Sequence, residues 1–583
     1  MQVPHLLSLF FKKTYSHFPA ILIALAIGIA TGAPQLYVVH QMGSAYKEIF
    51  PITSDDDRYY EGRSQEARDG FPMLGNPYVL EFRSAPSVSF WVPDATLSYA
   101  GEFLGLDVQY TSVFFDFTLP PILFLVTYAI LLLVTQSTLI SVAAASLFHL
   151  GFFLDTFTRS PSPQFNFLFV ELAIFLALRV IQSKKYAVPL LGAVLGTLFY
   201  IYPYYWTFTI AAVGMFFLAT LVRRELRSQI FPFGTALGVG TLLGSPVLYQ
   251  MYMLSHSVAY QETVSRLGLI RSHTPTGFST IVLCTVAASV VAMAIWRVES
   301  VRANLFSWFF LSAILGGLIA SNSQIITGKN GEFSIHYFLP AAYITFLAIT
   351  YILSIFFRSL PESINRRIVP SIALVLCIGA TIFLITESVV ARFKVHGENL
   401  EEQRYGPIML WLRENTAPES VVLAAEDTSY LIAAYTPDRI FYSRNANLHI
   451  MTDEEVWTRF YLLYYGAKYD DDFFTNHVGQ IWGAHYFDEY GHEMQLNKFR
   501  KLIGLPLVPA EVIPQAAKDT LRKFAASLSE KNPNLILGNR KIDYAISEPG
   551  FIIPGWMHDS YPTMHSVYVN GAFTIFALGP RKQ

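Results

Sequence analysis

Three consecutive aspartates, Asp55, Asp56 and Asp57, are the residues of this chain best suited to chemistry. Adjacent carboxylates repel one another, and a bound cation or a proton relieves that repulsion. Such a cluster can supply a general base, or it can bind a divalent metal ion through its oxygens. The alternative is structural, because Ser54 and the aspartates can also cap a following helix, and acidic runs usually face solvent.

The elements that must position these residues are those of a membrane protein. Of the 583 residues, 53% are hydrophobic and only 14% are charged, whereas a soluble domain carries about 25% charged residues. The mean hydropathy is +0.38. The net charge of −2 gives no reason to expect nucleic acid as a partner. Cys284 and Cys377 fall inside apolar runs and are expected to be small core residues rather than a disulfide or a metal site.

Hydropathy predicts a mainly α, polytopic protein with about eleven membrane spans. The predicted spans are 18–40, 117–135, 137–154, 165–182, 187–203, 205–222, 230–252, 277–296, 304–320, 336–357 and 368–391. The pair on either side of Pro203 is open to a second interpretation as one broken helix. The first span lacks a signal-peptide cleavage pattern and is expected to remain as an anchor.

The basic residues between the spans predict the orientation of the chain. With a cytoplasmic N-terminus, the Lys and Arg clusters of successive connections fall on the inner side, as the positive-inside rule requires. The longer polar segments then lie outside: 41–116, 155–164, 253–276, 321–335 and the C-terminal tail. A protein that elaborates one face is expected to act there. The short basic inner loops suit a bacterial or archaeal plasma membrane, although an endoplasmic reticulum protein would look similar.

Two units are expected: a transmembrane module over 1–394, which includes the first external loop at 41–116, and a soluble extracytoplasmic α/β domain over 395–583. The loop is predicted to contain a short helix directly after the aspartates and an amphipathic surface helix over 94–106, capped by Asp94. In the tail, helices are predicted at 405–416 and 429–435, strands at 421–425 and 440–443, and a hairpin around Asn570-Gly571.

This arrangement resembles the GT-C superfamily of membrane glycosyltransferases. A cytoplasmic N-terminus, one span, an acidic cluster opening a long external loop, further spans and a C-terminal external α/β domain carry the likeness. The superfamily includes oligosaccharyltransferase catalytic subunits, protein O-mannosyltransferases and aminoarabinose transferases. The Trp-Trp-Asp-Tyr-Gly signature of the oligosaccharyltransferases is absent, and 482–491 (WGAHYFDEYG) is only a loose echo of it, so transfer to asparagine is not expected.

The resemblance implies an enzyme that moves a sugar from a polyprenyl-phosphate or polyprenyl-diphosphate donor to an external acceptor, with inversion at the anomeric carbon. It assigns the role of base or metal ligand to the acidic cluster, with Asp56 favoured as base. Asp55 and Asp57 would be the ligands if Mg²⁺ or Mn²⁺ is used. A leaving phosphate needs cations near it, and the candidates are Arg58, Arg159, Arg266, His273 and His336. Each of these is as readily explained as an ordinary loop cation.

Two other functions stay open. A transporter or lipid flippase would explain the many spans, but internal repeats, paired broken helices and clear mid-membrane charges are not seen in the sequence. Glu171 and Glu387 lie near predicted span ends and are expected to be interfacial. A non-catalytic protein of the same fold that binds lipid or a cell-envelope partner is the second alternative. The sequence leaves open the sugar and whether the acceptor is protein, lipid or glycan.

Overall fold

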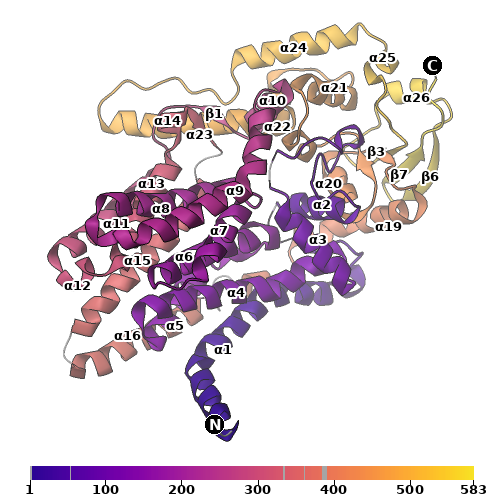
Figure 1. Ribbon diagram of the computed structural model, residues 1–583. Coiled ribbons are helices and arrows are strands. Elements are labelled where there is room, and N and C mark those ends of the chain that lie inside the picture. Colours follow the sequence, from indigo (N-terminus) through magenta and orange to yellow (C-terminus); the bar gives the residue numbers. More distant parts are fainter. Residues whose placement is uncertain are drawn as a thin grey trace.

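The computed structural model describes residues 3–52, 54, 56–88, 90–331, 335–359, 362–383 and 390–582. Asp55 and Glu387, which were singled out from the sequence, lie outside the described residues. The chain forms a bundle of long helices, and a mixed α/β unit lies against one end of it (Figure 1).

Apolar helices occur at all the predicted spans as far as the structure describes them, residues 384–389 of the last span lying outside the described residues. Within the described residues, seven helices are long and apolar enough to cross a membrane, and four further apolar helices are shorter. The long ones contain α1 (Val3–Met42), α4 (Val108–Thr135), α6 (Asn166–Ile181), α8 (Pro203–Val222), α9 (Ile230–Leu254), α11 (Phe278–Arg297) and α15 (Phe338–Ser359). The shorter ones are α5 (Thr138–Ser146) with the π-helix η3 (Leu147–Phe152), α7 (Ala187–Leu198), α13 (Leu305–Ser321) and part of α16 (Glu362–Phe383). The chain is therefore an integral membrane protein.

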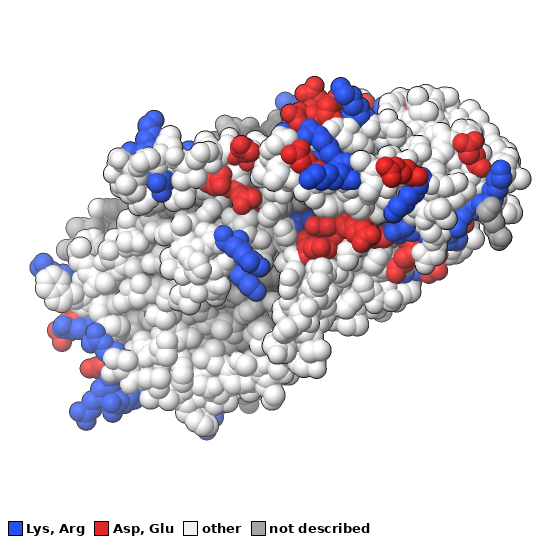
Figure 2. Space-filling view, turned by 90° about the horizontal axis from the view of Figure 1, so that it is seen from above, with Lys and Arg blue, Asp and Glu red and all other residues white. Residues whose placement is uncertain are grey.

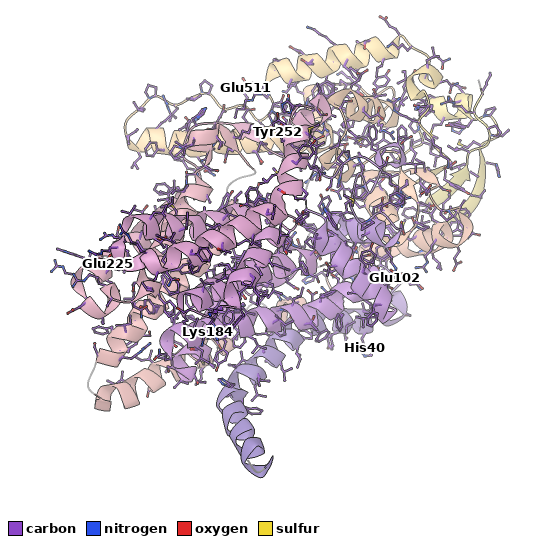
Figure 3. The ribbon with its side chains drawn as sticks, viewed as in Figure 1. His40, Glu102, Lys184, Glu225, Tyr252 and Glu511 are labelled. Carbon is purple, nitrogen blue, oxygen red and sulfur yellow. The ribbon has the colours of Figure 1, made fainter. Side chains whose placement is uncertain are left out.

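The labelled residues of Figure 3 show that alternate connections between the helices lie at opposite ends of the bundle. Lys184 and Glu225, from connections predicted to lie inside, are at one end of the bundle, and His40, Glu102 and Tyr252 lie toward the other end, where the α/β unit sits. Figure 2 shows charged side chains gathered over the α/β unit and at the opposite edge of the molecule, while the wide surface between them is mostly uncharged apart from a group of Lys and Arg near its centre. An uncharged band between two charged ends is the pattern expected of a membrane-embedded bundle.

Helices α7 and α9 pack closely because small residues face each other. A Cβ atom on Gly196 would lie 2.5 Å from the Cβ of Leu243, and one on Gly240 would lie 2.7 Å from the Cβ of Leu195. Such small-residue contacts let two membrane helices approach without a hydrophobic driving force between them. The break before α8 falls at Tyr202, directly before Pro203, so the structure has two helices here rather than one broken helix.

The loop at 41–116, which was predicted to be the first external loop, contains two helices, α2 (Asp57–Arg68) and α3 (Val92–Leu104), and the short 3-10 turn η2 (Leu80–Phe82). The predicted cap at Asp94 is wrong, because Trp91 occupies the N-cap position and makes no side-chain cap bond. Asp94 instead accepts hydrogen bonds from Arg63, at 3.0 Å from Nε and 2.7 Å from Nη2, and both side chains are fully buried. This ion pair joins α3 to α2.

The α/β unit is built on a mixed five-stranded sheet of order β4-β3-β5-β7-β6. Its strands are β3 (Val421–Leu423), β4 (Arg439–Ile440), β5 (Tyr544–Ser547), β6 (His565–Asn570) and β7 (Phe573–Ala577). Its main helices are α18 (Gly397–Glu402), α19 (Gly406–Asn415), α20 (Glu426–Tyr435), α21 (Asp453–Leu463), α22 (Asp471–Trp482), α23 (His485–Leu502), α24 (Gln515–Ser529), α25 (Pro533–Leu537) and α26 (Trp556–Ser560). The predicted hairpin at Asn570-Gly571 is confirmed as the β6–β7 turn. The helices α21 to α25, between β4 and β5, were not predicted.

The first external loop and the α/β unit share one hydrophobic core. Ile49, Tyr78 and Val79 of the loop belong to the same buried cluster as the strands of the sheet. Ion pairs also cross between the two parts: Arg439 lies 2.7 Å from Glu66, Arg58 lies 2.7 Å from Glu402, and Arg459 lies 2.9 Å from Glu81. Helix α2 is consequently held between the membrane bundle and the α/β unit.

Candidate functional site

A cleft opens where α2, the N-terminal end of α4 and the segment before α6 meet. Its empty volume is about 620 Å³, including the part open to solvent. The ionisable residues that line it are Asp57, Tyr60, Glu61, Arg68, Asp116 and Arg159. Carboxylates and arginines thus face one space at the membrane end of the first loop, which suits a reaction in which a proton and an anionic group are both handled.

Two members of the acidic cluster stand at the start of α2. Asp56 is the N-cap residue but makes no cap bond with its side chain. Its carboxylate forms an ion pair with Arg159, which comes from the segment between η3 and α6. Asp57 lines the cleft, and its Oδ2 accepts the Ser54 N–H at 3.0 Å. Both residues stand in the first turn of α2 or directly before it.

Glu61 lies one helical turn after Asp57, so the two side chains share a face of α2. Its Oε2 accepts a hydrogen bond from Arg58 Nη1 at 2.7 Å, and its side chain is only 12% exposed. Burial raises the pKa of the Glu61 carboxyl to about 7, against the opposing effect of the Arg58 charge. A carboxyl with this pKa can accept and release a proton near neutral pH. The sequence analysis did not single out Glu61.

Two arginines bring positive charge to the cleft. The Arg159 guanidinium lies 5.5 Å from the centre of the Tyr60 ring as well as against Asp56. Burial works against its charge, but Tyr60 and Asp56 together raise the pKa of Arg159. Arg68, at the end of α2, donates from Nη1 to the carbonyl of Leu106 at 2.7 Å. Arg159 was predicted from the sequence as a phosphate-binding residue, and Arg68 was not.

Asp116 is a buried carboxyl on the bundle side of the cleft. Its Oδ1 accepts hydrogen bonds from Gln164 Nε2 at 2.6 Å and from Ser160 Oγ at 3.2 Å, and its Oδ2 lies 3.4 Å from Gln35 Nε2. These three donors come from two segments that are distant in sequence, 160–165 and α1, and together they hold the carboxyl group in place. Sequence analysis missed Asp116 because α4 begins at Val108, capped by Asp107, about two turns before the predicted span.

Arg58 and Arg266 do not line the cleft and instead connect separate segments of the chain. Arg58 is buried, and besides Glu61 it contacts the carbonyl of Phe50 at 2.6 Å and the carboxylate of Glu402 at 2.7 Å. The buried guanidinium of Arg266 donates to the carbonyls of Asn447 and Met451 at 3.0 and 2.6 Å. It also pairs with Asp453. Both arginines therefore tie external segments to the α/β unit.

The two predicted histidines lie outside the cleft. Nδ1 of the exposed His273 is 3.1 Å from the carbonyl oxygen of Ile325. Nδ1 of His336 is 3.1 Å from the Tyr202 hydroxyl, and its ring lies 4.7 Å from that of Tyr204. Neither histidine lines the cleft around Asp57. Of the predicted site residues that are described, the structure brings Asp56, Asp57 and Arg159 together and leaves the others outside this space.

The described residues do not fit a metal centre. They contain no group of three or more His, Cys, Asp and Glu side chains placed to hold a metal ion. In the acidic cluster, Asp56 is paired with Arg159, and Asp57 accepts a backbone N–H. The Mg²⁺ or Mn²⁺ that the resemblance left open is therefore given no role in the chemistry derived from this cleft.

A second polar cluster lies inside the helix bundle. Thr127 Oγ1 lies 2.8 Å from Glu171 Oε1, 3.0 Å from the Tyr343 hydroxyl and 3.1 Å from His149 Nε2. All four side chains are at most 2% exposed. The expectation of an interfacial Glu171 is wrong, because α15 and η3, which are distant in sequence, close over it. Intramembrane ionisable residues of this kind are functional candidates by default.

The comparisons with known proteins give structural likeness only. No family model matches the chain, and no curated protein matches it. The oligosaccharyltransferase of Archaeoglobus fulgidus in complex with Zn and sulfate is similar with a TM-score of 0.45 and 13% identity, covering 72% of this chain and 62% of that chain. The same enzyme tethered to an acceptor peptide with the NVT sequon gives a TM-score of 0.46 at 12% identity, covering 92% and 69%.

ArnT from Cupriavidus metallidurans in the apo state is also similar, with a TM-score of 0.40 and 11% identity, covering 94% of this chain and 99% of that chain. This chain thus spans less than two thirds of the first oligosaccharyltransferase structure and nearly all of ArnT. Because every one of these TM-scores lies below 0.5, the case for function rests on the residues of the cleft.

Proposed function

We propose that this protein is a plasma-membrane glycosyltransferase that moves a sugar from a polyprenyl-phosphate or polyprenyl-diphosphate donor to an acceptor on the external face. The observation that supports this proposal is the cleft itself, in which Asp57, Glu61 and Arg159 face one space at the membrane end of the first loop. A lipid-linked donor presents its phosphate at this depth while its chain remains among the spans. A polar acceptor reaches the same point from outside.

Arg159 and Arg68 are the residues proposed to meet the donor phosphate. Both line the cleft, and arginine forms two parallel hydrogen bonds with a phosphate group. In the free protein Asp56 holds Arg159 by their ion pair. We assign Asp56 the role of orienting this arginine, so that the negative charge that develops on the leaving phosphate meets a cation already in place.

Glu61 is proposed to accept the acceptor's proton. The acceptor oxygen bonds to the anomeric carbon while its proton passes to a Glu61 carboxylate oxygen. The bond from the anomeric carbon to the phosphate oxygen breaks, and the phosphate departs with the bonding electron pair toward Arg159. Attack from the side opposite the phosphate inverts the anomeric carbon. Asp57 lies one turn before Glu61 on the same face of α2. Its carboxylate is proposed to accept hydrogen bonds from the hydroxyl groups of the sugar.

The experiment is donor turnover by membranes that contain the protein. Radiolabelled polyprenyl-phosphate hexoses and pentoses are supplied as a panel, and loss of the sugar from the lipid is measured. We expect turnover with at least one donor, and strong loss of it in Glu61→Gln and Arg159→Met. The matched control is Glu102→Gln, an exposed carboxylate on α3 outside the cleft. Equal turnover in all three variants would overturn the assignment.

One observation favours the transport alternative, namely the buried cluster of Glu171, His149, Thr127 and Tyr343 inside the bundle. A transporter would carry the intact sugar lipid or a solute across the membrane and would leave the glycosidic bond unbroken. The same membranes distinguish the two functions, because transport moves label between leaflets without releasing it from the lipid.

A further inference from the structure

The end of helix α23 carries an unusually apolar surface. Together with the turn that follows, it forms a tip segment, residues 498–507, in which four large aliphatic side chains point outward. Leu502 is 79% exposed, Ile503 52%, Leu505 47% and Leu507 59%. Three basic residues, Lys498, Arg500 and Lys501, lie in the same stretch. Contiguous apolar exposure of this kind marks a surface that contacts something other than water.

The tip segment has a defined backbone conformation that its own hydrogen bonds stabilise. Asn497 exchanges two hydrogen bonds with Val508, at 2.7 Å from its Nδ2 to the carbonyl and at 2.8 Å from the Val508 N–H to its Oδ1. Arg500 Nε donates to the carbonyl of Pro506 at 2.5 Å, and the Leu505 N–H donates to the carbonyl of Arg500 at 2.9 Å. These hydrogen bonds join the two ends of the tip segment, and its aliphatic side chains are exposed on the outside of the turn.

Helix α23 is attached to the external ends of the spans. His492 Nε2 lies 2.9 Å from Ser272 Oγ and 2.8 Å from Thr274 Oγ1. The span helix α11 begins at Phe278, four residues after Thr274, which places its start within about 13 Å along the chain. From His492 the helix runs about 15 Å further to Leu502. Figure 1 shows α23 beside the short strand β1 (Ile270–Arg271), near the end of α13, on the same side as the external helix ends.

We propose that the tip segment inserts its aliphatic side chains into the external leaflet of the bilayer, with Lys498 and Lys501 against anionic lipid headgroups. Apolar side chains flanked by lysine and arginine are what an interfacial segment presents to lipid. Another exposed aliphatic side chain, that of Ile326 at 82%, lies in the short helix α14 (Gln324–Thr327) that follows α13. This contact would hold the α/β unit at a fixed height over the cleft.

The experiment uses the full chain in lipid nanodiscs with an environment-sensitive NBD label on Leu502→Cys. Leu535→Cys is the matched control, since Leu535 is 77% exposed and lies on α25, far from the bundle. The unsubstituted protein reports background labelling at Cys284 and Cys377. We expect NBD at 502 to emit further to the blue than at 535 and to be quenched several-fold more by spin-labelled phospholipids. Equal quenching at the two positions would overturn the proposal.

The same measurement distinguishes lipid from a protein partner as the contact of the tip segment. Blue-shifted emission at 502 without quenching by spin-labelled lipid would mean that protein covers the tip segment, and the proposal would fail. The charge contribution is tested in Lys498→Gln/Lys501→Gln nanodiscs with and without phosphatidylglycerol. Quenching at 502 is expected to increase with phosphatidylglycerol in the parent protein and to lose that increase in the double variant. An increase that persists in the variant would overturn the headgroup contact.

Discussion

The proton-accepting role of Glu61 predicts a pH dependence with a defined midpoint. Burial raises the pKa of this carboxyl from 4.5 to about 7. If the rate follows the ionised fraction, that fraction is about 9% at pH 6, about 50% at pH 7 and about 91% at pH 8. Turnover at saturating donor should therefore rise about tenfold between pH 6 and pH 8. A carboxyl with an ordinary pKa is ionised throughout this range and would give a flat profile.

The assay is donor turnover by the purified protein in nanodiscs across this pH range, with thermal unfolding followed at each pH so that loss of fold is not mistaken for loss of base. Glu61→Gln should lower turnover by about 10²–10⁴-fold and remove the increase in turnover between pH 6 and pH 8. Glu102→Gln should keep both the turnover rate and its increase with pH, because the side chain of Glu102 is exposed on α3 and does not line the cleft.

Two results would refute this reasoning. The first is a flat profile between pH 6 and pH 8 in the parent protein. The second is full activity in Glu61→Gln together with inactivity in Asp56→Asn, which would assign the base to Asp56, the residue favoured from sequence position. In that case the burial of Glu61 by Arg58 and its neighbours would be structural, and the pH dependence would follow a carboxylate at the rim of the cleft.

Three further predictions follow from named contacts. Replacing Arg159 by Met removes a charged hydrogen bond to phosphate worth about 1.5–3 kcal/mol, so kcat/KM for the donor should fall about 10–150-fold in steady-state kinetics. Asp116→Asn turns one carboxylate oxygen into an NH2 donor that faces the buried donors of Gln35, Ser160 and Gln164, and it should cost about 1–3 kcal/mol in the free energy of unfolding; unchanged thermal unfolding would contradict this. Asp94→Ala leaves Arg63 buried without its counter-charge and should cost about 3–5 kcal/mol in the free energy of unfolding, much of it regained in Arg63→Met/Asp94→Ala.

The span pattern was predictable from the sequence because the bilayer requires long apolar helices, whose hydropathy is local information. The β6–β7 hairpin was predictable for a similar reason, since Asn570-Gly571 favours its tight turn by itself. The grouping of Asp56, Asp57 and Arg159 also followed from topology, because alternating spans place their segments on one face.

What the sequence did not show depends on contacts between distant segments. The environment of Glu61 is completed by Arg58, which itself is held by Glu402 and Tyr435 from beyond the last span. Glu171 is enclosed by α15, which supplies Tyr343, so its burial cannot be seen in its own helix. Asp94 has the residue type of a helix cap, yet its partner Arg63 lies one helix earlier in the chain.

The most direct test of glycosyl transfer is to follow the sugar itself. Purified protein in nanodiscs is given the radiolabelled polyprenyl-phosphate sugar that shows turnover, with an acceptor extract, and both lipid phosphate and labelled product are measured beside Glu61→Gln. The account predicts equal amounts of free lipid phosphate and glycosylated product from the parent protein, and neither from the variant. Intact labelled donor with every sugar tested, in a protein that unfolds cooperatively, would contradict it.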